Sequence, residues 1–190
     1  MSKIFIEDKT FEKIDFETNP LEFAEYENCK FINCNFHNSD LSNFAFAECL
    51  FETCNLSNSN LKNTALRDVK FRDCKLLGLH FENCNPFLFE VKFEKCSLNL
   101  SSFYQLNLKN TDFKKCSLQE CDFTECNLSN AIFDDSDLSQ AIFENSILEK
   151  TDFRTAFGYS IDPSKNRIKK AKFSLSGIAG LLDQHDILID

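Results

Sequence analysis

A bulky apolar residue recurs at every fifth position along most of this chain. One uninterrupted series runs from Phe11 to Phe81 and has fifteen members, and a second runs from Leu88 to Phe153 and has fourteen. A period of five matches neither the turn of an α-helix nor the two-residue alternation of a simple strand. The pattern therefore predicts one five-residue unit that is repeated many times.

The residue two places before each bulky position, i−2, is usually small. In a short extended segment, i−2 and i point to one side before the chain turns at i+1 and i+2. Each unit is therefore expected to form one wall and one corner of a coil whose backbone pairs with the coils above and below. Phe and Leu alternate strictly from Phe93 to Phe153, which suits closure after four units and equally after two. All ten cysteines lie at i−2: Cys29, Cys34, Cys49, Cys54, Cys74, Cys84, Cys96, Cys116, Cys121 and Cys126.

Residues 54–58 (CNLSN), 126–130 (CNLSN) and 136–140 (SDLSQ) resemble the A(D/N)LXX motif of the pentapeptide-repeat family. The resemblance covers roughly residues 9–155. It implies an all-β fold, a right-handed quadrilateral β-helix, to which the sequence adds a short C-terminal capping α-helix. We expect an N-terminal cap strand at 1–10, the repeat β-helix at 11–157 and, at 158–190, a last repeat unit followed by a helix and a strand.

The C-terminal segment has a second apolar pattern that predicts a cap. Four residues have helical spacing after a possible N-cap at Ser174, and three more suggest a closing strand. One interpretation is a lid over the last coil; resemblance to the Qnr and MfpA-like branch of the family implies instead that the segment joins two subunits end to end. The predicted dimer interface is Leu175, Ile178, Leu181, Leu182, Ile187, Leu188 and Ile189.

The five-residue register slips by two at 82–88. Because Pro86 has no N–H to donate to a ladder, a bulge is expected there. Phe87 and Phe89 flank Leu88 and are predicted to point outward, so that Pro86, Phe87 and Phe89 form a protrusion. The alternative is a tolerated insertion without function.

The chain shows no pattern typical of an active site. The cysteine spacings do not match a zinc site, which leaves the thiols as small inward fillers. His37, His80 and His185 have no catalytic constellation around them. We predict no enzyme activity, cofactor, metal or small-molecule substrate. No apolar run approaches the ~20 residues of a membrane span and no signal peptide is recognisable, so a cytoplasmic protein without a membrane partner is expected.

Charge separates one part of the chain from the rest. The net charge is −9, and residues 116–149 contain no Lys or Arg. Because like charges repel, direct nucleic-acid binding is disfavoured and a DNA-binding protein is the predicted partner. The predicted acidic partner-binding surface consists of Asp112, Glu120, Asp122, Glu125, Asp134, Asp135, Asp137, Glu144 and Asp152.

Two functions remain open from the sequence. Seven coils would form a rod of roughly 35 Å, and carboxylates along it could imitate duplex DNA. Resemblance to the Qnr-like branch implies a DNA mimic that binds a type II topoisomerase, DNA gyrase or topoisomerase IV, and modulates fluoroquinolone or toxin action. The alternative is an acidic scaffold or regulatory module for another protein, which would use the basic segment 165–172 or the bulge at Phe87.

Overall fold

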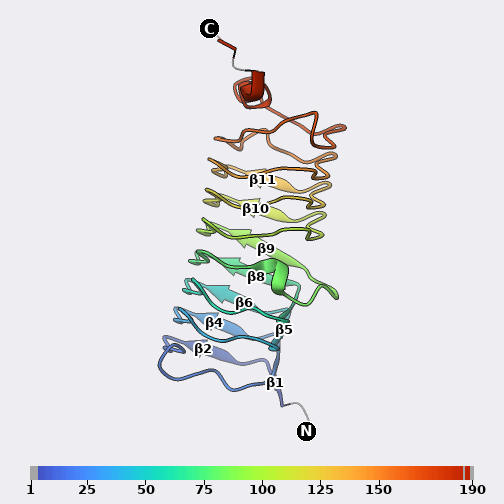
Figure 1. Cartoon of the computed structure of the whole chain (residues 1–190). Helices are drawn as coiled ribbons and strands as arrows, with labels where there is room; N and C mark the ends of the chain where they lie inside the picture. Colours follow the sequence, from blue (N-terminus) through green and yellow to red (C-terminus); the bar gives the residue numbers. More distant parts are fainter. Residues whose placement is uncertain (1–3, 186, 189–190) are drawn as a thin grey trace.

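The computed structural model describes residues 4–185, 187 and 188. The chain forms a column of stacked coils that ascends from β1 at one end to η3 at the other (Figure 1). The strands are β1 (Phe5–Glu7), β2 (Thr10–Glu12), β3 (Glu25–Glu27), β4 (Lys30–Ile32), β5 (Ala45–Ala47), β6 (Leu50–Glu52), β7 (Ala65–Arg67), β8 (Val69–Arg72), β9 (Val91–Glu94), β10 (Asp112–Lys114) and β11 (Ile132–Asp134). The described residues also form three short 3₁₀ helices: η1 (Phe81–Asn83), η2 (Ile178–Leu181) and η3 (Asp183–His185).

All strand pairs are parallel. One sheet has the order β1-β3-β5-β7 and the other β11-β10-β9-β8-β6-β4-β2. Phe11 pairs with Phe31 and Phe113 with Phe133, so a regular coil takes twenty residues, or four units. Single parallel bridges such as Ser117 to Asp137 continue the remaining walls. The register confirms the predicted all-β, four-walled β-helix and excludes closure after two units.

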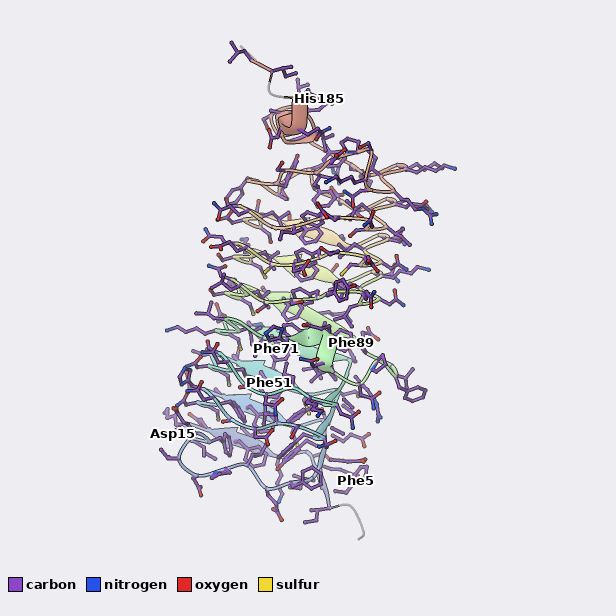
Figure 2. All side chains as sticks on the ribbon, in the orientation of Figure 1. Phe5, Asp15, Phe51, Phe71, Phe89 and His185 are labelled. Atoms are coloured by element: carbon purple, nitrogen blue, oxygen red, sulfur yellow. The ribbon has the colours of Figure 1, made fainter. Side chains whose placement is uncertain are left out.

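The bulky positions stack on one another inside the column. One stack contains nine phenylalanine rings with neighbouring centroids 4.7 to 5.5 Å apart. A second stack that includes Phe103 and Phe123 meets the first edge to face, a preferred aromatic geometry. Phe51 and Phe71 lie inside the column in Figure 2. The nine rings are Phe11, Phe31, Phe51, Phe71, Phe93, Phe113, Phe133, Phe153 and Phe173.

The inward residues at i−2 do more than fill space. The Sγ of Cys54 donates to the carbonyl oxygen of Phe31 at 3.2 Å and accepts the backbone N–H of Cys34 at 3.4 Å. Serine and threonine at i−2 donate in the same way to the coil below. The ten thiols are free and buried, and burial raises the pKa of Cys49 and Cys121 to about 12. Cys49 and Cys121 therefore stay protonated donors within the core.

The register slip places two extra residues just after a corner. Asn85 pairs with Ala65, twenty residues back, whereas Val91 pairs with Val69, twenty-two back. Two predictions at this bulge were wrong: Leu88, expected to point inward, is 64% exposed, and Phe89, expected to point outward, packs against the core. The reason is that Leu88 takes the left-handed corner position, with φ 57°, so the insertion follows the turn.

The predicted capping α-helix was also wrong. The cap contains the 3₁₀ helices η2 and η3, in which backbone N–H groups donate to carbonyl oxygens three residues earlier. One example is the N–H of Leu182, which donates to the carbonyl oxygen of Ala179 at 2.8 Å. Glycine weakens an α-helix, and a Cβ at Gly180 would collide with the carbonyl oxygen of Tyr159. The carbonyl of Gly180 also accepts the N–H of Ile161 at 2.8 Å, which fixes the segment on the last coil.

The two ends of the column differ from each other. At the N-terminal end β1 pairs in register with β3, so it forms a wall of the first coil. At the C-terminal end Phe173 stacks on Phe153, while Ile187 and Leu188 are not in a strand. The third residue of the predicted closing strand, Ile189, lies outside the described residues. Among the described residues, no helix is long and apolar enough to cross a membrane.

Candidate partner-binding surface

The four walls can be named by the inward residues of one coil. Wall 1 contains Phe113, wall 2 Leu118, wall 3 Phe123 and wall 4 Leu128. The nine predicted acidic residues occupy three of these walls and their adjoining corners. Wall 1 carries Asp112, Asp134, Asp135 and Asp152; wall 2 carries Glu120 and Asp137; wall 3 carries Asp122, Glu125 and Glu144.

Six of the nine carboxylates belong to a single coil and form what we call the acidic belt: Glu120, Asp122, Glu125, Asp134, Asp135 and Asp137. None of the six makes an ion pair with any described residue. Their partners are neutral: Glu125 accepts from Gln105 at 2.8 Å, and Asp137 from Gln119 at 2.7 Å. The belt therefore keeps its negative charge. It extends around three walls within one turn and does not run along the axis of the column.

The coil above the belt is largely neutralised. Asp152 pairs with Arg154 at 2.7 Å and Lys172 at 3.4 Å, and Glu144 pairs with Lys165 at 3.0 Å. The hydrogen bonds from Arg154 lower the pKa of Asp152 to about 2. These two predicted site residues thus present little net charge to a partner.

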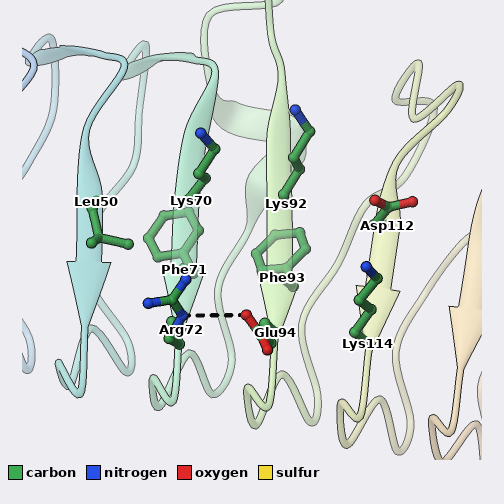
Figure 3. A pocket seen from close by; sticks show the side chains of 9 residues that line it. All are labelled: Leu50, Lys70, Phe71, Arg72, Lys92, Phe93, Glu94, Asp112 and Lys114. Carbon is green, nitrogen blue, oxygen red and sulfur yellow. Dashed lines mark hydrogen bonds and ion pairs between the residues drawn. The ribbon is translucent and has the colours of Figure 1, made fainter.

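The coils below the belt carry a basic hollow on wall 1 (Figure 3). It has a volume of about 150 Å³ and is lined in part by Lys70, Arg72, Lys92 and Lys114, with Asp112 beside Lys114 on β10. Arg72 donates to Glu94 at 3.2 Å, and Lys70 and Lys92 are direct cross-strand partners. This surface was not predicted from the sequence, although lysine at the same position of two successive coils was a usable signal. The hollow limits the acidic surface on its N-terminal side.

The predicted protrusion is present in part. Phe87 is 65% exposed, and the guanidinium of Arg67 lies 5.9 Å from its ring centroid, a cation–π contact. Pro86 is exposed beside it, whereas Phe89 packs inward.

The predicted dimer interface is mostly exposed. Leu175 and Leu188 are almost fully exposed, and Ile178 and Ile187 are about half exposed. Leu181 instead packs against the core and Leu182 is partly buried. End-to-end association stays a prediction for the exposed part of this segment. Within the described residues, no group of three or more His, Cys, Asp or Glu side chains could hold a metal ion.

A family model described as "Pentapeptide repeat region" matches residues 24–86 and 86–157. The chain belongs to the pentapeptide-repeat family. No curated protein matches it in sequence. Among solved structures, it is similar to trypsin-treated QnrB1, a plasmid-mediated fluoroquinolone resistance protein, with a TM-score of 0.61, 14% identity and 100% of both chains covered.

A second similar structure is HetL, a pentapeptide repeat protein involved in heterocyst differentiation regulation from the cyanobacterium Nostoc sp. Its TM-score is 0.50 with 16% identity, over 92% of this chain and 88% of HetL. At such identities these likenesses establish the fold and leave the partner to be argued from the surface.

Proposed function

We propose that this pentapeptide-repeat protein is a non-enzymatic DNA mimic that binds a type II topoisomerase, DNA gyrase or topoisomerase IV, and modulates fluoroquinolone or toxin action. The observation that carries the proposal is the acidic belt, with six carboxylates in one coil and no ion pair among described residues. The fold similarity over the full length to QnrB1, a plasmid-mediated fluoroquinolone resistance protein, supports the fluoroquinolone part of the proposal. Such a partner would place the protein in the cytoplasm.

The shape of the belt favours a concave binding site. Its carboxylates lie on three of the four walls, so a flat surface would reach only some of them. The stack of nine phenylalanines spans eight coil spacings, or about 38 Å, which is the scale of a duplex segment in a protein groove. A site that normally surrounds DNA offers cationic side chains on several sides, because DNA carries regular charge on both strands.

Purified bacterial gyrase provides the test. We would measure its affinity for the protein and the inhibition of supercoiling across a salt titration. The belt variant is Glu120→Gln, Glu125→Gln and Asp135→Asn, three exposed corner residues with positive φ, where amides keep the shape. Wild-type affinity should fall steeply with salt, and the belt variant should bind more weakly with a shallower salt dependence.

A matched control removes three charges from the opposite end of the column: Glu7→Gln, Glu27→Gln and Glu48→Gln, all at exposed positions. This variant has the same net charge as the belt variant and should bind gyrase like the wild type. Absence of gyrase binding at tens of micromolar protein, or equal loss in both variants, would contradict the proposal.

The second candidate function is a scaffold for another protein, and the exposed Phe87 favours it. Exposed phenylalanine is costly on a free surface but common in protein interfaces. If Phe87→Ser abolishes capture of a cellular partner while the belt variant retains that partner, the scaffold function replaces DNA mimicry.

A further inference from the structure

The outward position i−1 carries an unusual set of residues from β11 into the first part of the next coil. In most other coils this position is polar, as at Asn55, Ser102 and Asn107. Between residues 132 and 157 it holds four bulky apolar residues, one on each wall: Ile132, Phe157, Ile142 and Ile147 on walls 1 to 4. Ile132, Ile142 and Phe157 are 39%, 48% and 55% exposed.

On the three belt walls each of these apolar residues is paired with an aspartate of a neighbouring coil. Asp122 is the direct parallel partner of Ile142, and Asp137 is that of Phe157. Ile132 lies between Asp112 and Asp152. Side chains of direct cross-strand partners lie close enough to be touched by one group of a partner molecule. Wall 4 lacks the aspartate, since Ile147 pairs with Asn127 and Arg167.

Two of the isoleucines also lie in grooves with charged rims. Ile132 lines a groove of about 420 Å³ with Asp134, Asp152 and Arg154, of which Asp152 is already paired with Arg154 and Asp134 has no ion pair to a described residue. Ile142 lines one of about 390 Å³ with Asp162, Asp183, Glu144 and Lys165, of which Glu144 is already paired with Lys165. Lysine and arginine suit such grooves, because their aliphatic stems pack on apolar surface while the charged head stays at the carboxylates.

The fold does not require apolar residues here. The coils stack through their inward residues and backbone, and Ser102, Asp122 and Ile142 follow one another at the same position of wall 3. Exposed isoleucine and phenylalanine therefore have an unfavourable effect on solubility with no packing gain. These residues also have no counterpart in duplex DNA, whose phosphate backbone presents charged groups to a partner.

We infer that Ile132, Ile142 and Phe157 are specificity-determining contacts of the topoisomerase interface. They receive the aliphatic stems of basic side chains whose charged heads reach the neighbouring aspartates. This inference rests on the proposed function and refines it: the acidic belt supplies the salt-dependent part of the affinity, and the apolar residues supply a part that salt does not screen. Binding then distinguishes a matched protein surface from any other basic surface.

The experiment compares two double variants in binding to purified gyrase holoenzyme. The interface variant is Ile132→Thr and Ile142→Thr, which keeps β-branching on the walls. The control variant is Ile4→Thr and Phe5→Thr, which removes two exposed apolar residues from the opposite end of the column. We expect the interface variant to weaken binding about tenfold at every salt concentration, with the slope of log affinity against log salt unchanged. The control should match the wild type.

The outcomes separate this inference from the proposed function. Wild-type binding that is unchanged in the interface variant overturns the inference and leaves DNA mimicry intact. A changed salt slope in the interface variant also overturns it, because the isoleucines would then act through charge. No gyrase binding by the wild-type protein overturns both. Circular dichroism of each variant checks that the β-helix is retained.

Discussion

Replacing Ser136 by alanine tests whether the residues at i−2 join the coils by hydrogen bonds or only fill space. Ser136 is fully buried. It occupies the same i−2 position as Cys116, one coil above it. Its Oγ donates to the carbonyl oxygen of Phe113 at 3.1 Å and accepts the N–H of Cys116 at 3.0 Å. Alanine removes both interactions and leaves the buried N–H without its acceptor.

The expected loss of stability follows from that N–H. A buried donor left without a partner costs about 1–3 kcal/mol, whereas removal of one oxygen leaves almost no cavity. We therefore expect Ser136→Ala to lower the free energy of unfolding by about 2 kcal/mol. Ser136→Cys should lose less than about 1 kcal/mol, because Cys54 makes the same two interactions through sulfur in its own coil.

Urea denaturation followed by far-UV circular dichroism measures both changes. Ser97→Ala is the matched control, since Ser97 is an outward serine whose hydroxyl makes no hydrogen bond to the described residues. The reasoning is refuted if Ser136→Ala is as stable as Ser97→Ala. It is also refuted if Ser136→Cys is destabilised as much as Ser136→Ala, because the sulfur would then not replace the hydrogen bonds of the serine hydroxyl.

Three further predictions concern the core, the bulge and acid stability. Phe113→Leu should lower the unfolding free energy by about 1–2 kcal/mol in urea titrations, because it leaves a gap between two stacked rings; no change would contradict the stacked core. Leu88→Asn should raise that free energy by about 0.5–1 kcal/mol, since asparagine tolerates φ 57° better than an exposed leucine; destabilisation would contradict this. The pKa of Asp152 is lowered from 3.8 to about 2 in the folded protein, so its stabilising effect is complete above pH ~4 and is lost as pH falls toward 2. Asp152→Asn should therefore flatten the pH dependence of thermal unfolding in that window, and an unchanged slope would argue against the ion pair with Arg154.

The walls of the fold were predictable because each depends on residues within one unit. A bulky residue at i and a small one at i−2 define an inward pair, and repetition fixes the stack. The number of walls was not predictable, since closure after two units also stacks phenylalanine on phenylalanine, with Phe113 on Phe123. Only the pairing register, which depends on contacts between coils, excludes that alternative.

The errors occurred where a segment leaves the repeat. Pro86 correctly indicated a bulge, but the choice between Leu88 and Phe89 as the inward residue depends on which one takes the left-handed corner. In the cap, apolar spacing from Leu175 favoured an α-helix, while the close contacts of Gly180 with Tyr159 favour 3₁₀ turns. Both outcomes depend on tertiary contacts that no local pattern contains.

The belt carboxylates were predicted as a site from the absence of lysine and arginine in their segment, yet their effect depends on neighbours in adjacent coils. Cations of the last coil pair with Glu144, Glu149 and Asp152, and the basic hollow lies below the belt on wall 1. The six belt carboxylates, which have no ion pair to a described residue, therefore lie within one turn of the coil, a layer only about 5 Å high. A partner that contacts so thin a layer can gain affinity only by enclosing several walls or by adding contacts other than charge. The three-walled distribution of the belt meets the first condition, and the exposed Ile132 beside Asp134 and Ile142 one coil above Asp122 meet the second.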